Sequence, residues 1–236
     1  MKDNSQLEKK IGVTFKNKDL LKEALTHRSY LNENPSWPHP HNERLEFLGD
    51  AVIELIITEV LFKQFPDKPE GELTSLRAAL VNANMLFEIS KKIGFNEYIK
   101  LSRGESKDTG RARQYILANT FEAITGAMYL DQGIKTSKIF LEKYLLLRLP
   151  DIISNHLYKD PKSLFQEKAQ EYASVTPHYE VLKEQGPDHD KHFSVGVYLA
   201  DEMIAKGDGP SKQAAQEEAA KKALEIKGWE YNNHAS

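Results

Sequence analysis

The 236-residue sequence contains no cysteine. This absence excludes disulfide bridges, thiolate zinc sites, iron–sulfur clusters and cysteine nucleophiles, and it is compatible with a reducing cytoplasm, where we expect the protein to act. Long apolar runs are also missing, so we expect no membrane span, no signal peptide and no membrane partner. No phosphate-binding loop or dinucleotide fingerprint occurs, so we expect no small-molecule cofactor.

An excess of positive charge is absent too. Residues 1–158 hold 22 Lys and Arg against 21 Asp and Glu, a net charge of +1, whereas residues 159–236 hold 10 against 14, a net charge of −4. Polyanion-binding proteins usually carry net positive charge. A role in nucleic-acid binding must therefore rest on the placement of individual residues.

The apolar pattern divides the chain into two regions. Up to about Arg148, apolar residues recur at spacings of three and four, which predicts an all-α region. After Pro150, one amphipathic helix, three alternating segments and an Ala-rich helix predict the order α-β-β-β-α. We expect a multidomain α and α+β protein, with domains over 1–155 and 156–228 and a tail over 229–236. The helices expected in the first region cover 5–11, 17–30, 41–64, 70–93, 111–132 and 134–148.

One predicted helix carries an unusual acidic stripe. In NERLEFLGDAVIELIITEVLF, Glu43, Glu46 and Asp50 follow the spacing i, i+3, i+7, which keeps them within roughly 60° of the helix circumference. Apolar residues occupy nearly every other direction, which is typical of a central, buried helix. We therefore expect that these carboxylates are not simply a solvated face.

A second predicted helix offers a matching face. In ILANTFEAITGAMYLD, Asn119, Glu122 and Gly126 repeat the i, i+3, i+7 spacing, and Ala118 and Ala123 flank them. Small residues at these positions permit close approach to the acidic stripe.

Carboxylates crowded in a low-dielectric environment must bind protons, pair with cationic side chains or hold a metal ion. Oxygen-only ligands favour a hard cation such as Mg²⁺ or Mn²⁺. The alternative is a structural network in which the carboxylates pair with Arg28, Arg44 or Arg77 on a helical scaffold. The spacing favours a divalent-metal site but does not indicate a substrate.

The segment NERLEFLGDAV at 42–52 resembles the signature of the ribonuclease III family. The resemblance extends to ALTHRSY at 24–30, PEGELTSLRAALVN at 69–82 and ILANTFEAITGAMYLD at 116–131, in the expected order. The α-β-β-β-α region resembles the double-stranded-RNA-binding domain appended to the bacterial members. Together the two resemblances cover nearly all of residues 5–228.

The resemblance implies an Mg²⁺-dependent endoribonuclease, with Mn²⁺ as a substitute, that cuts both strands of double-stranded RNA in RNA processing and maturation. It implies 5′-phosphate and 3′-hydroxyl ends and a homodimer with one site per subunit. Two sites related by a twofold axis can cut opposite strands in one binding event.

The resemblance also implies roles for individual residues. The expected metal ligands are Glu46, Asp50, Asn119 and Glu122, of which Asp50 and Glu122 are the expected catalytic residues. Glu43 is expected to support them, and Glu70 to approach the site from the partner subunit.

Asn119 departs from the family pattern, in which many relatives have Asp. An amide oxygen still ligates Mg²⁺, but it removes one negative charge from the site. Three interpretations stay open at this point: an active natural variant, a weakened enzyme, and a catalytically silent double-stranded-RNA-binding protein.

RNA duplexes are recognised by shape, through 2′-hydroxyls and phosphates, over about 16 base pairs. The resemblance places minor-groove contacts at Gln166 and Glu167 on the first helix of the second region. It places a further contact at His189 in the loop GPDHDKHF. At the start of the last helix, Ser211 and Lys212 lie at a positive N-terminus that suits a phosphate.

Overall fold

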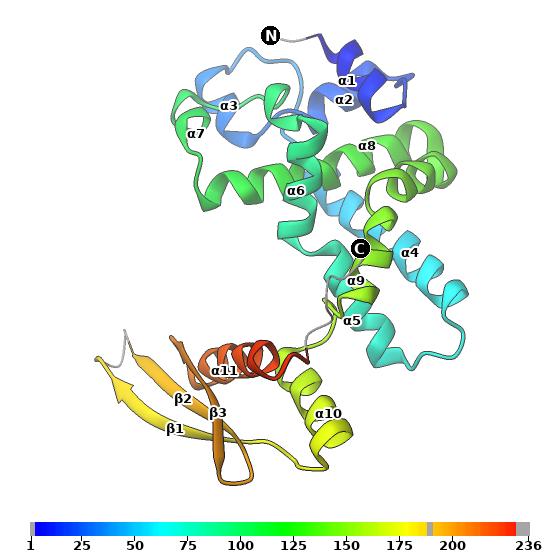
Figure 1. The fold of residues 1–236 in the computed structure, drawn as a ribbon. Helices are drawn as coiled ribbons and strands as arrows, with labels where there is room; N and C mark the ends of the chain where they lie inside the picture. The colour runs from blue at the N-terminus through cyan, green and yellow to red at the C-terminus, as the bar shows by residue number, and fades with distance from the viewer. Residues whose placement is uncertain (1–2, 188–190, 230–236) are drawn as a thin grey trace. The chain divides into compact units, whose positions relative to one another are not determined.

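The computed structural model describes residues 3–187 and 191–229 (Figure 1). Helices make up the first part of the chain, and three strands with a helix before and after them in sequence make up the second. The helices of the first part are α1 (Asn4–Ile11), α2 (Lys18–Ala24), α3 (Arg28–Glu33), α4 (Glu43–Gln64), α5 (Glu70–Val81), α6 (Ala83–Ile93), α7 (Arg103–Lys107) and α8 (Arg111–Tyr144), with 3₁₀ turns η1 (Phe95–Glu97) and η2 (Leu146–Arg148). The remaining elements are α9 (Leu149–Ser154), α10 (Pro161–Ala173), β1 (His178–Gln185), β2 (His192–Leu199), β3 (Glu202–Gly209) and α11 (Lys212–Lys227).

The predicted fold class is confirmed, and most segment boundaries agree within a few residues. Two predicted helices are each divided. The segment 17–30 breaks between α2 and α3, where Thr26 pairs with Lys100 in an isolated parallel bridge. The segment 70–93 breaks at Asn82, whose side chain accepts a hydrogen bond from the backbone N–H of Met85 and so begins α6.

Helix α8 changes direction at Gly133. This residue has φ 80° and ψ −178°, a conformation open essentially only to glycine. The sequence pattern predicts this break between 132 and 134. Two short helices were not predicted, α7 and α9, because segments of five or six residues are too short for a periodic apolar pattern to show.

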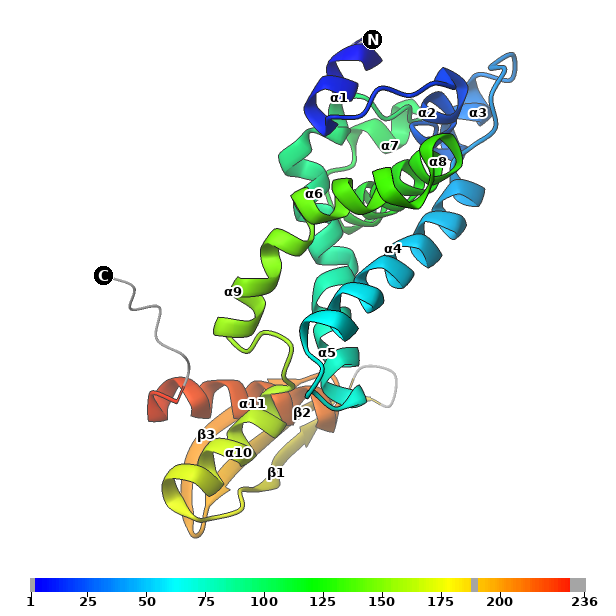
Figure 2. The same ribbon diagram turned by 90° about the vertical axis from the view of Figure 1, so that its right-hand side faces the viewer.

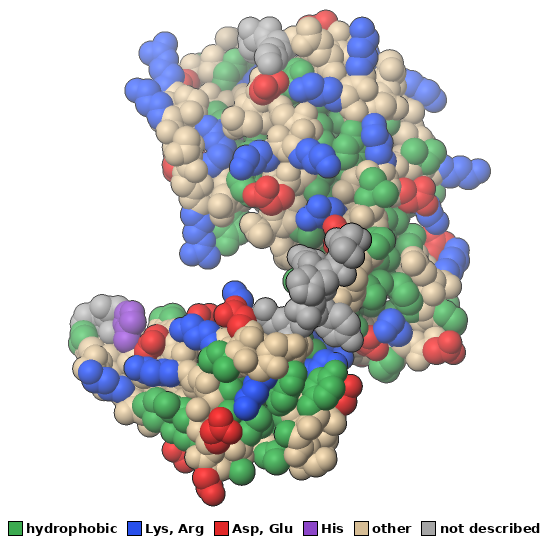
Figure 3. Space-filling view, viewed as in Figure 1, with side chains coloured by type: hydrophobic (Ala, Val, Ile, Leu, Met, Phe, Trp, Pro, Cys, Tyr) green, Lys and Arg blue, Asp and Glu red, His purple; other side chains and the backbone are tan. Residues whose placement is uncertain are grey.

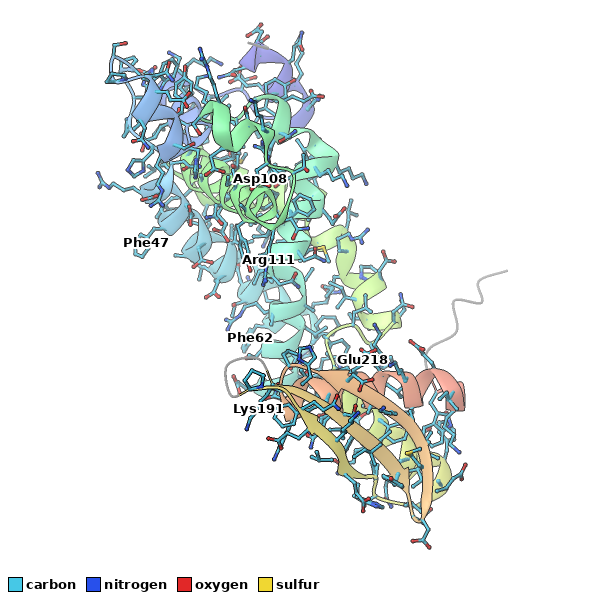
Figure 4. All side chains as sticks on the ribbon, turned by 90° about the vertical axis from the view of Figure 1, so that its left-hand side faces the viewer. Phe47, Phe62, Asp108, Arg111, Lys191 and Glu218 are labelled. Carbon is cyan, nitrogen blue, oxygen red and sulfur yellow. The ribbon has the colours of Figure 1, made fainter. Side chains whose placement is uncertain are left out.

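The prediction that α4 is buried on nearly all sides is wrong. One face is buried, through Leu45, Val52, Ile53, Ile56, Ile57 and Leu61. The opposite side exposes Phe47, Leu55 and Phe62 to 81%, 64% and 70%. Figure 4 shows Phe47 and Phe62 projecting from α4. The apolar residues of α4 therefore lie on two faces, one in the core of the helical unit and one at its surface.

The sheet of the second region is antiparallel in the order β1-β2-β3. Val181 pairs with Val195 and Val197 pairs with Ala205 in its register. Helices α10 and α11 cover one face (Figure 2), and the core between them contains Phe165, Val197 and Ala219. The alanines of α11 therefore allow the helix to pack closely on the sheet.

The chain forms two compact units, Met1–Pro150 and Asp151–Ser236. The predicted domain boundary at 155/156 lies five residues after this division, within a connection that contains α9, and it stays a prediction. No helix among the described residues combines the length and apolar character that crossing a bilayer requires.

Candidate active site

Helices α4 and α8 cross at two glycines. A Cβ atom built on Gly49 would overlap the carbonyl oxygen of Glu122, and one built on Gly126 would overlap the carbonyl oxygen of Leu45. Backbone therefore packs directly on backbone at this crossing. The sequence predicts the close approach on the α8 side, through Gly126, but Gly49 was missed. The signal was present, since a glycine in the middle of an apolar helix is destabilising unless a neighbour needs the space.

The crossing brings the two acidic faces together. Glu46 accepts a hydrogen bond from the Asn119 side chain, and both residues are half-buried. Burial raises the pKa of Glu122 to about 8, and the charges of Asp50 and Glu46 act in the same direction. Burial also raises the pKa of Glu46, with contributions from Glu43 and Asp50. The structure thus places Asn119 beside Glu46, and it places the charges of Glu46 and Asp50 close enough to Glu122 to affect its pKa.

The alternative that the acidic side chains form structural ion pairs fits only one of them. Glu43 lies 3.6 Å from Arg28 and 3.8 Å from His41. Among the residues that the structure describes, no Lys, Arg or His lies within ion-pair distance of Glu46, Asp50 or Glu122. These three carboxylates repel one another without a protein cation to offset the repulsion.

The carboxylates are not already arranged as a metal cage. Within the described ranges 3–187 and 191–229, no group of three or more His, Cys, Asp or Glu side chains is gathered closely enough to hold a metal ion. Asp50 is exposed to solvent.

Glu70 lies apart from this cluster, at the N-terminus of α5. Its carboxylate accepts a hydrogen bond of 2.9 Å from Thr74 and lines a pocket of about 400 Å³. Leu61, Phe62 and Leu73 also line this pocket, so its wall continues the exposed apolar stripe of α4. Glu70 does not affect the pKa of Glu46 or Glu122 in this chain.

The predicted RNA-contacting residues of α10 lie together on its surface. Gln166 and Glu167 are exposed and line a shallow depression with Ser163 and Gln170. Glu167 is ion-paired with Lys159.

At the start of α11, the Ser211 side chain accepts a hydrogen bond of 3.1 Å from the backbone N–H of Ala214 and so caps the helix. The Nζ of Lys212 lies 5.7 Å from the centre of the Phe193 ring. Ser211 and Lys212 are both exposed. The predicted contact at His189 lies outside the described residues.

Comparisons with known proteins agree with this geometry. Residues 17–149 match the Ribonuclease-III-like family, a span that contains all four residues of the acidic cluster. The chain belongs to the ribonuclease III family. Residues 161–227 match the double-stranded RNA binding motif, which covers the α-β-β-β-α unit.

Relatives of the ribonuclease III family extend over almost the full chain. Ribonuclease 3 of a Nitratiruptor species is 46% identical over 226 residues, which cover 96% of this chain and 97% of that protein. Ribonuclease 3 of a Sulfurovum species is 48% identical over 95% of this chain and 98% of that protein. Among solved structures, a nuclease domain of ribonuclease III from Campylobacter jejuni matches with a TM-score of 0.57 and 36% identity, covering 63% of this chain and 99% of that one; its description refers to a region involved in dimer formation.

Proposed function

We propose that this protein is a divalent-metal-dependent endoribonuclease that cleaves double-stranded RNA to 5′-phosphate and 3′-hydroxyl ends and acts in RNA processing. One observation carries the proposal: at the α4–α8 crossing, three carboxylates without a cationic partner lie close enough for the charges of Asp50 and Glu46 to raise the pKa of Glu122, in a chain that also has a double-stranded RNA binding motif. The comparisons lend no support to the alternative of a catalytically silent binder.

The donor set fits a hard divalent cation. Glu46, Asp50 and Glu122 supply carboxylate oxygens and Asn119 an amide oxygen, the ligand type that Mg²⁺ and Mn²⁺ prefer. The raised pKa values of Glu46 and Glu122 show that negative charge is unfavourable here without a compensating cation. We infer that these four residues hold the metal.

A bound divalent ion stabilises charge on the scissile phosphate and lowers the pKa of water. The protein's own residues position the ion and gain or lose protons as it binds. Glu122 would hold the ion through its ionised carboxylate, with its proton released to solvent, and Asn119 would offer its carbonyl oxygen while its NH2 group stays available to Glu46. Glu43, held between Arg28 and His41, supports the first turn of α4 next to Glu46.

For RNA binding, we propose that Gln166 and Glu167 contact a minor groove and that Ser211 and Lys212 hold a phosphate at the positive end of α11. The binding unit carries few cations, and those in Figure 3 are scattered over the visible surface rather than gathered in one patch. We therefore expect modest affinity from this unit alone, with the catalytic unit contributing to substrate binding. His189 stays a prediction in this scheme.

We further propose that the protein acts as a homodimer. The exposed residues Phe47, Leu55 and Phe62 and the adjoining apolar pocket form one continuous surface on α4 and α5. A twofold axis through this surface buries it against its own copy. Glu70, on the rim of the pocket, would then approach the partner subunit's acidic cluster. The cytoplasmic location stays a prediction.

The test is digestion of a long perfect RNA duplex with and without Mg²⁺. We expect wild-type protein to cut the duplex only with the metal, and Glu122→Gln to leave it intact. Single-stranded RNA and duplex DNA of the same sequence serve as substrate controls. An intact RNA duplex after incubation with micromolar wild-type enzyme and Mg²⁺ would remove the enzymatic interpretation.

A further inference from the structure

The acidic face of α8 continues toward the start of the helix. Arg111, Tyr115, Asn119 and Glu122 follow spacings of four, four and three residues, which keeps them within about 80° of the helix circumference. Along the axis, Tyr115 lies roughly 6 Å and Arg111 roughly 12 Å from Asn119. A strand lying over the acidic cluster therefore passes Tyr115 and Arg111 when it follows α8 toward its N-terminus.

Arg111 and Tyr115 form a pair on this exposed face. The guanidinium carbon of Arg111 lies 5.9 Å from the centre of the Tyr115 ring, and its Nη2 lies 3.5 Å from the Tyr115 hydroxyl. Arg111 is exposed and Tyr115 is 48% exposed. No carboxylate of the described residues pairs with Arg111. The guanidinium is thus held by a neutral partner, and its charge remains available to an anion.

The neighbouring Arg113 has a different role. It donates hydrogen bonds of 2.8 Å to the carbonyl oxygen of Glu105 and 3.1 Å to that of Asp108, so it ties the end of α7 to α8. The Asp108 carboxylate in turn accepts a hydrogen bond of 2.7 Å from the Gly110 N–H. The turn before Arg111 is therefore fixed, and Figure 4 shows Arg111 at the start of α8 beneath Asp108. The backbone at Arg111 is therefore held in place by the hydrogen bonds of the preceding turn.

We propose that Arg111 binds a phosphate of the substrate strand beside the cleavage site, and that Tyr115 is the positioning residue that holds its guanidinium for this contact. The inference rests on the proposed function and adds a substrate-binding subsite to it. Arg suits this task because its planar fork bonds phosphate oxygens, and because a ring face orients the fork at little entropic cost.

The test measures binding of a short fluorescent RNA duplex to the full chain by anisotropy, with Ca²⁺ in place of Mg²⁺ and across a range of KCl concentrations. We expect Arg111→Gln to raise Kd roughly tenfold and to lower the slope of log Kd against log salt by about one, as loss of one phosphate contact predicts. At saturating RNA with Mg²⁺, kcat should stay near that of wild type, since the contact lies outside the metal site.

Lys9→Gln is the matched control, because it removes one exposed positive charge near the opposite end of α8, where Tyr144 bonds the carbonyl oxygen of Lys10. It should leave Kd and slope unchanged. Equal values for Arg111→Gln and Lys9→Gln would overturn the proposal.

Tyr115→Ala should raise Kd as Arg111→Gln does, and the double variant should be no worse than Arg111→Gln alone, because both changes remove one contact. Fully additive effects, or an unchanged Kd in Tyr115→Ala, would overturn the role of Tyr115. Absence of cleavage by wild type would remove the nuclease function, but the binding comparison would still decide on the subsite.

Discussion

The Asn119 side chain donates a hydrogen bond to the Glu46 carboxylate across the crossing of α8 and α4. This bond lowers the pKa of Glu46, against the opposing effects of burial and of the charges on Glu43 and Asp50. An Asp at 119 could not donate it at neutral pH. Asn119 therefore stabilises the acidic cluster in the metal-free protein, while it offers one charge fewer to a bound cation.

From this relationship we expect Asn119→Asp to bind Mg²⁺ about tenfold more tightly, since a fourth carboxylate adds attraction to the cation. The metal-free variant should be less stable than wild type, because like charges then face each other across the crossing. Isothermal titration calorimetry measures the first effect and urea unfolding with chelator the second. Asn84→Asp, an exposed change on α6, is the control. An unchanged affinity for Mg²⁺ would exclude Asn119 as a ligand.

Metal binding should release protons. Because the pKa of Glu122 is raised to about 8, this carboxyl is largely protonated at pH 7 and must ionise to become a ligand. We expect Mg²⁺ uptake at pH 7 to release up to one proton per site, seen as a dependence of the calorimetric enthalpy on buffer ionisation enthalpy. Glu122→Gln should lose both Mg²⁺ binding and proton release. The control Glu88→Gln, at an exposed position, should lose neither. Uptake without proton release would contradict the raised pKa.

The same group makes metal-free stability depend on pH. The folded pKa of Glu122 lies above its ordinary value of 4.5, so the folded protein binds more protons between about pH 4.5 and pH 8, and stability falls as pH rises through that window. Glu122→Gln should be more stable than wild type by about 2 kcal/mol at pH 9, after allowance for partial exposure, and similar at pH 5. Urea unfolding followed by Trp37 fluorescence, in a Trp229→Phe background, reports the helical unit. A stability difference between Glu122→Gln and wild type that grows toward acid pH would contradict the raised pKa of Glu122.

The glycine crossing predicts a steric effect. Gly49→Ala places a methyl group against the Glu122 carbonyl and should destabilise the helical unit by about 3 kcal/mol while weakening Mg²⁺ binding. Gly71→Ala is the matched control, because its Cβ meets nothing within 4 Å and alanine favours the helix. Urea midpoints compare the two variants. Equal urea midpoints for Gly49→Ala and Gly71→Ala would show that α4 and α8 can move apart without loss of stability.

The exposed stripe of α4 predicts the oligomeric state. Phe47→Asp places a charge at its most exposed aromatic residue and should convert a dimer to a monomer, measured by light scattering after size-exclusion chromatography. Ile226→Asp, at another exposed apolar position on α11, should leave the dimer intact. A wild-type monomer at micromolar concentration would contradict the proposed assembly.

Much of the fold could be predicted because local patterns determine it. The break at Gly133, the α-β-β-β-α order and the packing role of the α11 alanines all follow from spacing and residue type. The divisions at 25–27 and at Asn82 could not be predicted with the same rules. A bridge from Thr26 to Lys100 is a long-range contact, and an N-cap within a continuous apolar pattern leaves the periodicity almost unchanged.

The acidic cluster could be predicted as residue types on two helix faces, but not as a geometry. Spacing placed Glu46 with Asp50 and Asn119 with Glu122, and the apolar neighbours suggested burial. Phe47 and Asp50 are nevertheless exposed. The periodicity of a single chain does not distinguish core positions from surface positions that another molecule covers.

The contact between Gly49 and the main chain at Glu122 has a bearing on how such a protein tolerates change over evolution. Where two helices meet through side chains, each exchange of one apolar residue for another shifts their separation and any ligand set carried on them. Here the helices touch through backbone atoms, which every residue type shares. We therefore expect exchanges among leucine, isoleucine and valine at the remaining contacts of the helical unit to disturb the spacing of the acidic residues less than any change at Gly49 or Gly126.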